Sequence, residues 1–238
     1  METIRSASPW AGMSLGEIAT ADLRKAQVLK KFGLDFCCGG KKSLLTACAE
    51  KGIDSDQLLQ ELEAAQQSAA TGVPNFKDWT PALLVDYIIQ MHHAYVLKTL
   101  PDLLYYAGKV AKVHGQEHPE LLDIQQLVMM INEEMRDHMQ KEEGVLFPYI
   151  KNPVQQPFFG TVNNPIAMME QEHEQVGDAL ARIRVLTNNY SIPEGACGSY
   201  QFYFRLLEEF ENDLHIHVHL ENNILFPKAK ALEKMQQF

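Results

Sequence analysis

The chain has 238 residues, of which 46% are hydrophobic and 22% are charged, and its formal net charge is -10. This is enough for one large domain or for a smaller domain with an added module, and the acidic balance argues against a nucleic-acid partner. No apolar run approaches the roughly 20 residues that span a bilayer, and the start lacks the basic and apolar regions of a signal peptide. We therefore expect a cytoplasmic protein with no membrane partner.

Residues 1–70 are predicted to form a small helical module. Ser14 and Glu17 have the spacing of a capping box at a helix start. Thr20 is expected to cap a further helix, which Gly33 ends. A core of this size is marginal, so we expect the module to dock on the rest of the chain.

The sequence LDFCCGGKK follows and predicts a tight, glycine-rich turn that places two thiols near the start of another helix. That helix is expected over residues 43–51 and stops at Gly52. The last helix of the module is expected over residues 54–70. Its apolar face carries Leu58, Leu59 and Leu62.

After a predicted linker over residues 71–79, the remainder, residues 80–238, is predicted to form an antiparallel four-helix bundle. Thr80 followed by Pro81 is a strong helix start, and Pro101 is expected to bend the first helix. Strand patterns are absent from the sequence, so the fold class is all-α. The four helices are expected at residues 81–113, 119–150, 161–187 and 194–234.

The pattern His-x-x-x-Glu occurs twice in the predicted bundle, as His138 with Glu142 and as His217 with Glu221. Residues four apart project from one face of a helix, so each pair presents an imidazole and a carboxylate in one direction. One such pair is also a common helix-stabilising contact. Two copies, each followed by an apolar residue and Phe-Pro, instead predict two helices that share a metal centre.

The other two bundle helices supply the missing partners. His93 lies on the first and His173 on the third, so all four helices bring a histidine toward a common level. Four imidazoles with two carboxylates able to bridge suit a pair of iron ions. The spacing of four, with histidine first, favours a haemerythrin-like site over a ferritin-like one. The expected ligands are His93, His138, Glu142, His173, His217 and Glu221.

The remaining five histidines are expected on the solvated surface. His92 is adjacent to His93, and either could bind the metal, but His93 is the preferred ligand. His114 would lie about 31 Å beyond His93 along a straight helix, which is too far for both to bind one metal centre. His215 and His219 flank a ligand at two-residue spacing and point away from it. His118 falls in a connection.

The four cysteines contain no Cys-x-x-Cys pair, which argues against a zinc ribbon. Cys48 and Cys197 stand alone and are expected to be buried as small hydrophobic residues. Cys37 and Cys38 are adjacent. Their bland interpretation is a structural turn with buried sulfurs.

The motifs together resemble the RIC family, the di-iron proteins of repair of iron centres. The resemblance extends from about Ser14 to Pro227 and includes the order of a cysteine-pair module followed by a haemerythrin-like domain. It is carried by DFCCGG at 35–40, HMQKEEGVLFP at 138–148, MEQEH at 169–173 and HLENNILFP at 219–227.

The resemblance implies a stress-induced bacterial protein that restores iron-sulfur clusters damaged by nitrosative or oxidative stress. It places the family's metal ligands on the six residues chosen by spacing, and a further recurrent histidine on His114. It places the cysteine pair on Cys37 and Cys38. Glu134 and Glu172 match recurrent acids expected close to the metals.

The first functional hypothesis is iron donation to iron-sulfur client proteins from an oxo- and carboxylate-bridged pair of iron ions. In this hypothesis Cys37 and Cys38 receive iron, engage the client or exchange thiols, with Lys41, Lys42 and a helix start lowering a thiol pKa.

The second is an enzyme that reduces nitric oxide to nitrous oxide, with Glu134 or Glu172 relaying protons. The third is a sensor or carrier that binds O2 or nitric oxide. Monomer and homodimer both remain open.

Overall fold

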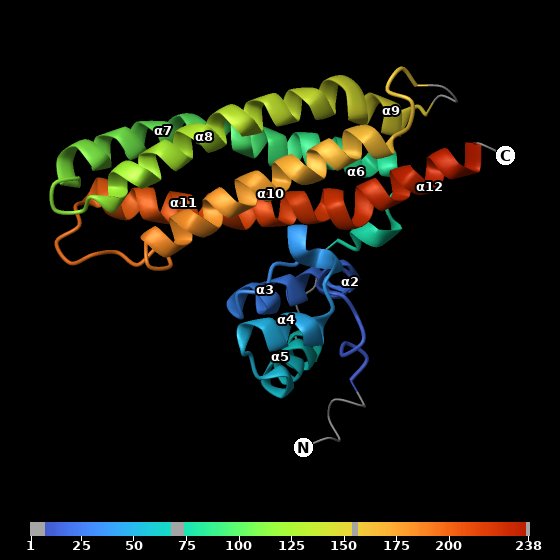
Figure 1. Cartoon of the computed structure of the whole chain (residues 1–238), viewed down its shortest axis with the longest axis horizontal. Helices are drawn as coiled ribbons and strands as arrows, with labels where there is room; N and C mark the ends of the chain where they lie inside the picture. The colour runs from blue at the N-terminus through green and yellow to red at the C-terminus, as the bar shows by residue number, and fades with distance from the viewer. Residues whose placement is uncertain (1–7, 68–73, 154–156, 237–238) are drawn as a thin grey trace. The chain divides into compact units, whose positions relative to one another are not determined.

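Every regular element in the described part of the chain is helical, which confirms the predicted all-α class (Figure 1). The computed structural model describes residues 8–67, 74–153 and 157–236. It divides into two units: Met1–Leu84 with Val218–Lys228, and Val85–His217 with Ala229–Phe238. None of the helices formed by the described residues is long and apolar enough to cross a membrane.

The first unit begins with a capping box that the structure confirms, because Ser14 accepts the backbone N–H of Glu17 while Glu17 accepts that of Ser14. Asp22, and not Thr20, caps the next helix, so that prediction is wrong. The first helix ends at Ala21, and the extended backbone at Asp22 lets its carboxylate accept the N–H of Arg24. The helices here are α2 (Leu15–Ala21), α3 (Leu23–Lys31), α4 (Leu44–Lys51) and α5 (Ser55–Gln67).

Gly33 and Gly52 follow α3 and α4 with φ of 66° and 65°. This left-handed conformation favours glycine, which confirms both predicted helix ends. Residues 68–70, the end of the predicted last helix of the module, lie outside the described residues. Leu58, Leu59 and Leu62 of α5 are fully buried, as their spacing predicts.

The bundle helices lie close to their predicted bounds. The first run comprises α6 (Pro81–Tyr87), a π turn (Ile88–His93) and α7 (Ala94–His114), and it continues through Pro101. The second comprises α8 (Glu120–Lys141), a π turn (Glu142–Leu146) and α9 (Phe147–Lys151). The third is α10 (Asn163–Leu186). The fourth comprises α11 (Gly198–Leu220), a π turn (Glu221–Leu225) and α12 (Phe226–Gln236).

The π turns in the second and fourth runs have a cause in the sequence. Phe147 donates its backbone N–H to Glu142, and Phe226 donates to Glu221, each five residues back instead of four. In both cases the next residue is proline, which has no N–H to continue the α-helical pattern. The repeated Phe-Pro therefore favours a widened turn directly after each repeated glutamate.

The core of the first unit gives a stability prediction. Leu62→Ala removes a fully buried side chain from α5 and should lower the free energy of unfolding by about 2–5 kcal/mol. Both tryptophans of the chain, Trp10 and Trp79, lie in this unit, so their fluorescence during urea unfolding reports on it. Leu45→Ala, at a leucine that is 39% exposed, is the matched control. Equal losses from the two substitutions would contradict the assigned core.

Candidate metal centre

The six predicted ligands come together, and each is at most 3% exposed. They form two groups of four in which each residue offers one ligand atom within 4.8 Å of the others. One group is His93, Glu142, His217 and Glu221, and the other is His138, Glu142, His173 and Glu221. Each group therefore has two imidazoles of its own, and both glutamates are common to the two groups.

Glu142 is placed between histidines of both groups. Its Oε2 lies 3.3 Å from Nε2 of His93 and 3.3 Å from Nε2 of His138. His173 turns its Nε2 toward the same point, 3.0 Å from Nε2 of His138. A carboxylate in this position could join two cations, each completed by nitrogen donors. The donor set fits a pair of iron ions, because imidazole and carboxylate are ligands that iron accepts.

Outer carboxylates hold two of these imidazoles in place. Nδ1 of His93 lies 2.7 Å from Oε1 of Glu143, and Nδ1 of His138 lies 2.9 Å from Oε2 of Glu172. An ionised carboxylate only accepts hydrogen bonds, so each Nδ1 carries the proton and each Nε2 turns its lone pair toward the cluster. This carboxylate–histidine arrangement is typical of metal ligands.

Glu172 also contacts Lys141, whose Nζ lies 2.5 Å from Oε1. Burial acts to raise the pKa of Glu172, but hydrogen bonds from His138 and Lys141 outweigh it and hold the pKa below the ordinary value of 4.5. Glu172 therefore lies where it was expected, next to a candidate ligand. Glu134 lies half-buried on α8, outside both donor groups.

Two histidines assigned to the surface are buried, so that prediction is wrong for them. His92 is 5% exposed, its Nδ1 lies 2.9 Å from Oδ1 of Asp213, and its ring stacks on His217. His219 is fully buried within the first unit, and burial lowers its pKa to about 4. The spacing predicts that His219 points away from the cluster. A side chain that points away from the cluster need not reach solvent, and His219 does not.

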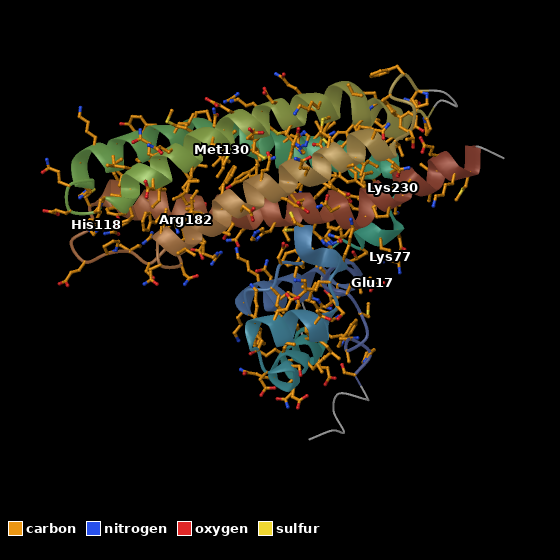
Figure 2. All side chains as sticks on the ribbon, viewed as in Figure 1. Glu17, Lys77, His118, Met130, Arg182 and Lys230 are labelled. Carbon is orange, nitrogen blue, oxygen red and sulfur yellow. The ribbon has the colours of Figure 1, made fainter. Side chains whose placement is uncertain are left out.

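Histidines at the far end of the bundle stay outside the cluster. His118 lies at the connection of α7 and α8 and contacts Glu120 (Figure 2). Nε2 of His114 lies 3.2 Å from Sγ of Cys197. Cys197 is exposed, so its predicted burial is wrong, whereas Cys48 is buried as expected. His114 belongs to neither donor group.

The cysteine pair lies in the first unit, with Cys37 buried and Cys38 half-buried. A hydrogen bond with Cys38, burial and the negative charge of Asp35 raise the pKa of the Cys37 thiol well above its ordinary value. The predicted lowering by nearby lysines is therefore wrong for Cys37. Lys42 is instead paired with Glu50.

Sequence reasoning did not identify Glu143 or Asp213 as partners of histidines. Glu143 follows a candidate ligand directly, and Asp213 precedes His217 by one helical turn. The sequence signal that could have identified these partners is an acidic residue directly next to, or one helical turn from, a ligand of the repeated motif. The histidine that each one meets lies on another helix, which the local pattern does not show.

Comparison with known proteins identifies the class. Residues 84–229 match the family described as the Hemerythrin HHE cation binding domain, and residues 11–66 match ScdA_N, a domain of unknown function (DUF542). The chain is thus a cation-binding helical bundle preceded by a second, smaller domain.

Curated relatives make the assignment more particular. The chain is 37% identical over 222 residues to the iron-sulfur cluster repair protein YtfE of Escherichia coli O81, covering 92% of this chain and 97% of the relative. It is 36% identical, with the same coverage, to proteins of that name from Escherichia fergusonii and Escherichia coli O7:K1. The chain belongs to the haemerythrin-domain family that includes these repair proteins, which confirms the resemblance found in the sequence.

The outer carboxylates give a prediction for metal affinity. Glu143→Ala removes the acceptor that orients His93 and should lower iron affinity by roughly 10–100-fold, measured by competition with a chromophoric chelator. Glu143 is 41% exposed, so its loss should leave the fold intact. Glu174→Ala, at an exposed position on α10, is the control. Unchanged affinity in Glu143→Ala would show that this contact does not position the ligand.

The lowered pKa of Glu172 predicts a pH dependence of stability. Its contribution is fully present above its unfolded value of 4.5 and is lost as the pH falls through the lower folded value. In the metal-free protein, Glu172→Gln should therefore be less stable than the parent chain at about pH 7, with a difference that shrinks toward about pH 3. Urea unfolding measured across this range tests the sign. A difference that grows on acidification would contradict it.

Proposed function

We propose that this chain binds two iron ions in its helical bundle and supplies iron to damaged iron-sulfur clusters of client proteins in the cytoplasm. The observation that carries the proposal is the sharing of Glu142 and Glu221 by both donor groups. Each ion would have two histidines of its own, with two glutamates between the ions. The name of the curated relatives, iron-sulfur cluster repair protein, supports the same direction.

The donor set favours release over permanent retention. Iron-sulfur clusters are held by thiolates, and the bundle offers imidazole and carboxylate donors. Ferrous iron held by nitrogen and oxygen donors can pass to the thiolates of a damaged cluster. Iron bound here would supply labile ferrous ions as the cargo of repair.

The surrounding residues have defined tasks in this proposal. Glu143 and Glu172 orient the imidazoles, and Lys141, which is 40% exposed, connects Glu172 with solvent. Glu172 could thereby exchange a proton as His138 gains or loses a cation. Residues 1–70 would form the module that engages the client, residues 71–79 the linker and residues 80–238 the bundle.

The shared glutamates allow a test of the two-ion arrangement. Glu142→Gln should weaken both sites, so the purified protein loses both irons. His173→Gln removes a donor from one group only, so the iron at the other group should stay bound more firmly than the iron at the altered group. Metal analysis with Mössbauer spectroscopy distinguishes these outcomes and should show a coupled pair in the parent chain. A mononuclear or zinc-only parent protein would refute the proposal.

Iron transfer is tested separately. The protein is loaded with a Mössbauer-active iron isotope and incubated anaerobically with a client whose cluster nitric oxide has damaged. The label should appear in the cluster of the re-isolated client, whereas recovery without label would rule out donation. Nitrous oxide is measured in a parallel reaction with nitric oxide and a reductant. Its catalytic formation would favour the nitric oxide reductase instead.

A further inference from the structure

The loop before the short 3-10 helix Cys38–Lys41, together with the first residue of that helix, gathers three groups able to bind a cation. Asp35, Cys37 and Cys38 each offer a ligand atom within 4.8 Å of the other two. Sγ of Cys37 lies 3.0 Å from Oδ1 of Asp35. We propose that these residues form a second, mononuclear site that binds a ferrous ion through two thiolates and one carboxylate. Only the identity of the metal rests on the proposed function.

The backbone fixes the carboxylate before any ion arrives. Oδ1 of Asp35 accepts the N–H groups of Cys37 and Cys38 at 2.9 and 3.1 Å, and Oδ2 accepts that of Gly39 at 2.8 Å. A carboxylate has about four acceptor positions, so Oδ2 retains capacity for a cation. The same N–H groups place positive dipole ends beside a site that becomes strongly negative when both thiols ionise.

A second set of contacts, made by Asn223 of the first unit, holds the backbone of the loop. The side-chain amide of Asn223 donates to the carbonyl oxygens of Phe36 and Cys37 at 3.2 and 3.1 Å. A Cβ at Gly40 would lie 2.5 Å from Oδ1 of Asn223, so any larger residue there would displace the Asn223 side chain from this position. The loop is thus held in one conformation, as a preorganised site requires.

The geometry leaves room for exchange. Asp35 is exposed and Cys38 is half-buried, so two of the three donors are accessible to solvent, whereas Cys37 is buried. Three donors leave a position for a fourth ligand, which a thiolate of a client can occupy. On binding, the ferrous ion forms bonds to both sulfurs and one oxygen, and the two thiol protons pass to solvent. No change of oxidation state is needed, and transfer to a client exchanges one set of thiolates for another.

The competing interpretation is that Asp35 only caps the turn and that the thiols have a structural role. The single amide oxygen of asparagine can still accept the N–H groups of Cys37 and Cys38, but its NH2 group cannot accept that of Gly39, and the side chain carries no charge. Asp35→Asn therefore keeps two of the three backbone contacts of the cap and weakens the cation site. Asp54 offers a matched control, because its carboxylate also accepts backbone N–H groups, at the start of α5, and it belongs to none of the candidate metal-binding groups found among the described residues.

The experiment uses the full chain with its bundle already loaded with iron. Anaerobic titration with Co²⁺ should produce thiolate-to-cobalt charge-transfer absorption that saturates at one equivalent. Cys37→Ser and Cys38→Ser should each reduce this absorption, and Asp35→Asn should lower the affinity at least about tenfold. Asp54→Asn and Cys197→Ser, at an exposed cysteine, should behave like the parent chain. Circular dichroism and bundle iron content confirm that each variant is folded.

Absence of the charge-transfer absorption, or its persistence in both Cys37→Ser and Cys38→Ser, would overturn the site. Unchanged affinity in Asp35→Asn would remove Asp35 from the ligand set and overturn the three-donor proposal. Because binding is measured without a client, the result is independent of iron donation. A Co²⁺ site in a protein that fails to transfer iron would leave this site standing and refute only the proposed function.

Discussion

Burial of charge at the centre of the bundle is the constraint on which the rest of the structure depends. Two carboxylates and four imidazoles lie together, none more than 3% exposed. Removing an ionised carboxylate from water costs several kcal/mol unless an opposite charge compensates it. Two divalent cations would supply that compensation for Glu142 and Glu221. Around the cluster, Glu143 and Glu172 meet the outward nitrogens of His93 and His138 and remain in contact with solvent.

The sequence predicted much of this arrangement because helical periodicity is local. Four-residue spacing places His138 with Glu142, and His217 with Glu221, on common faces, which gives four candidate ligands from the sequence alone. His93 and His173 complete the set because they lie on the other two predicted bundle helices. The outer partners could not be chosen in this way. Glu143 meets His93 across 50 positions of sequence, and Asp213 meets His92 across 121. Such pairs depend on how helices rotate against each other.

The wrong predictions about histidines and cysteines share a physical origin, since each concerned the environment of a side chain and not its position in a helix. His219 turns away from the cluster as expected, but it meets Asn223 and the ring of Phe36 instead of water. Lysines near Cys37 suggested a thiolate, yet its immediate neighbours are a second thiol and a carboxylate. Spacing gives the direction of a side chain along its own helix. It does not reveal what that direction contains.

The widened turns after Glu142 and Glu221 have a consequence for how such chains vary. A π turn accommodates one more residue than the α-helix around it, so it separates the register of the residues before it from that of the residues after it. Removing one residue there would restore regular winding and rotate the following segment by about 100°. The ligands upstream would keep their facing while Phe147 and Phe226 left the core. Each widened turn thus separates the helical register of the donor residues before it from that of the packing residues after it, so substitutions in one set need not alter the orientation of the other.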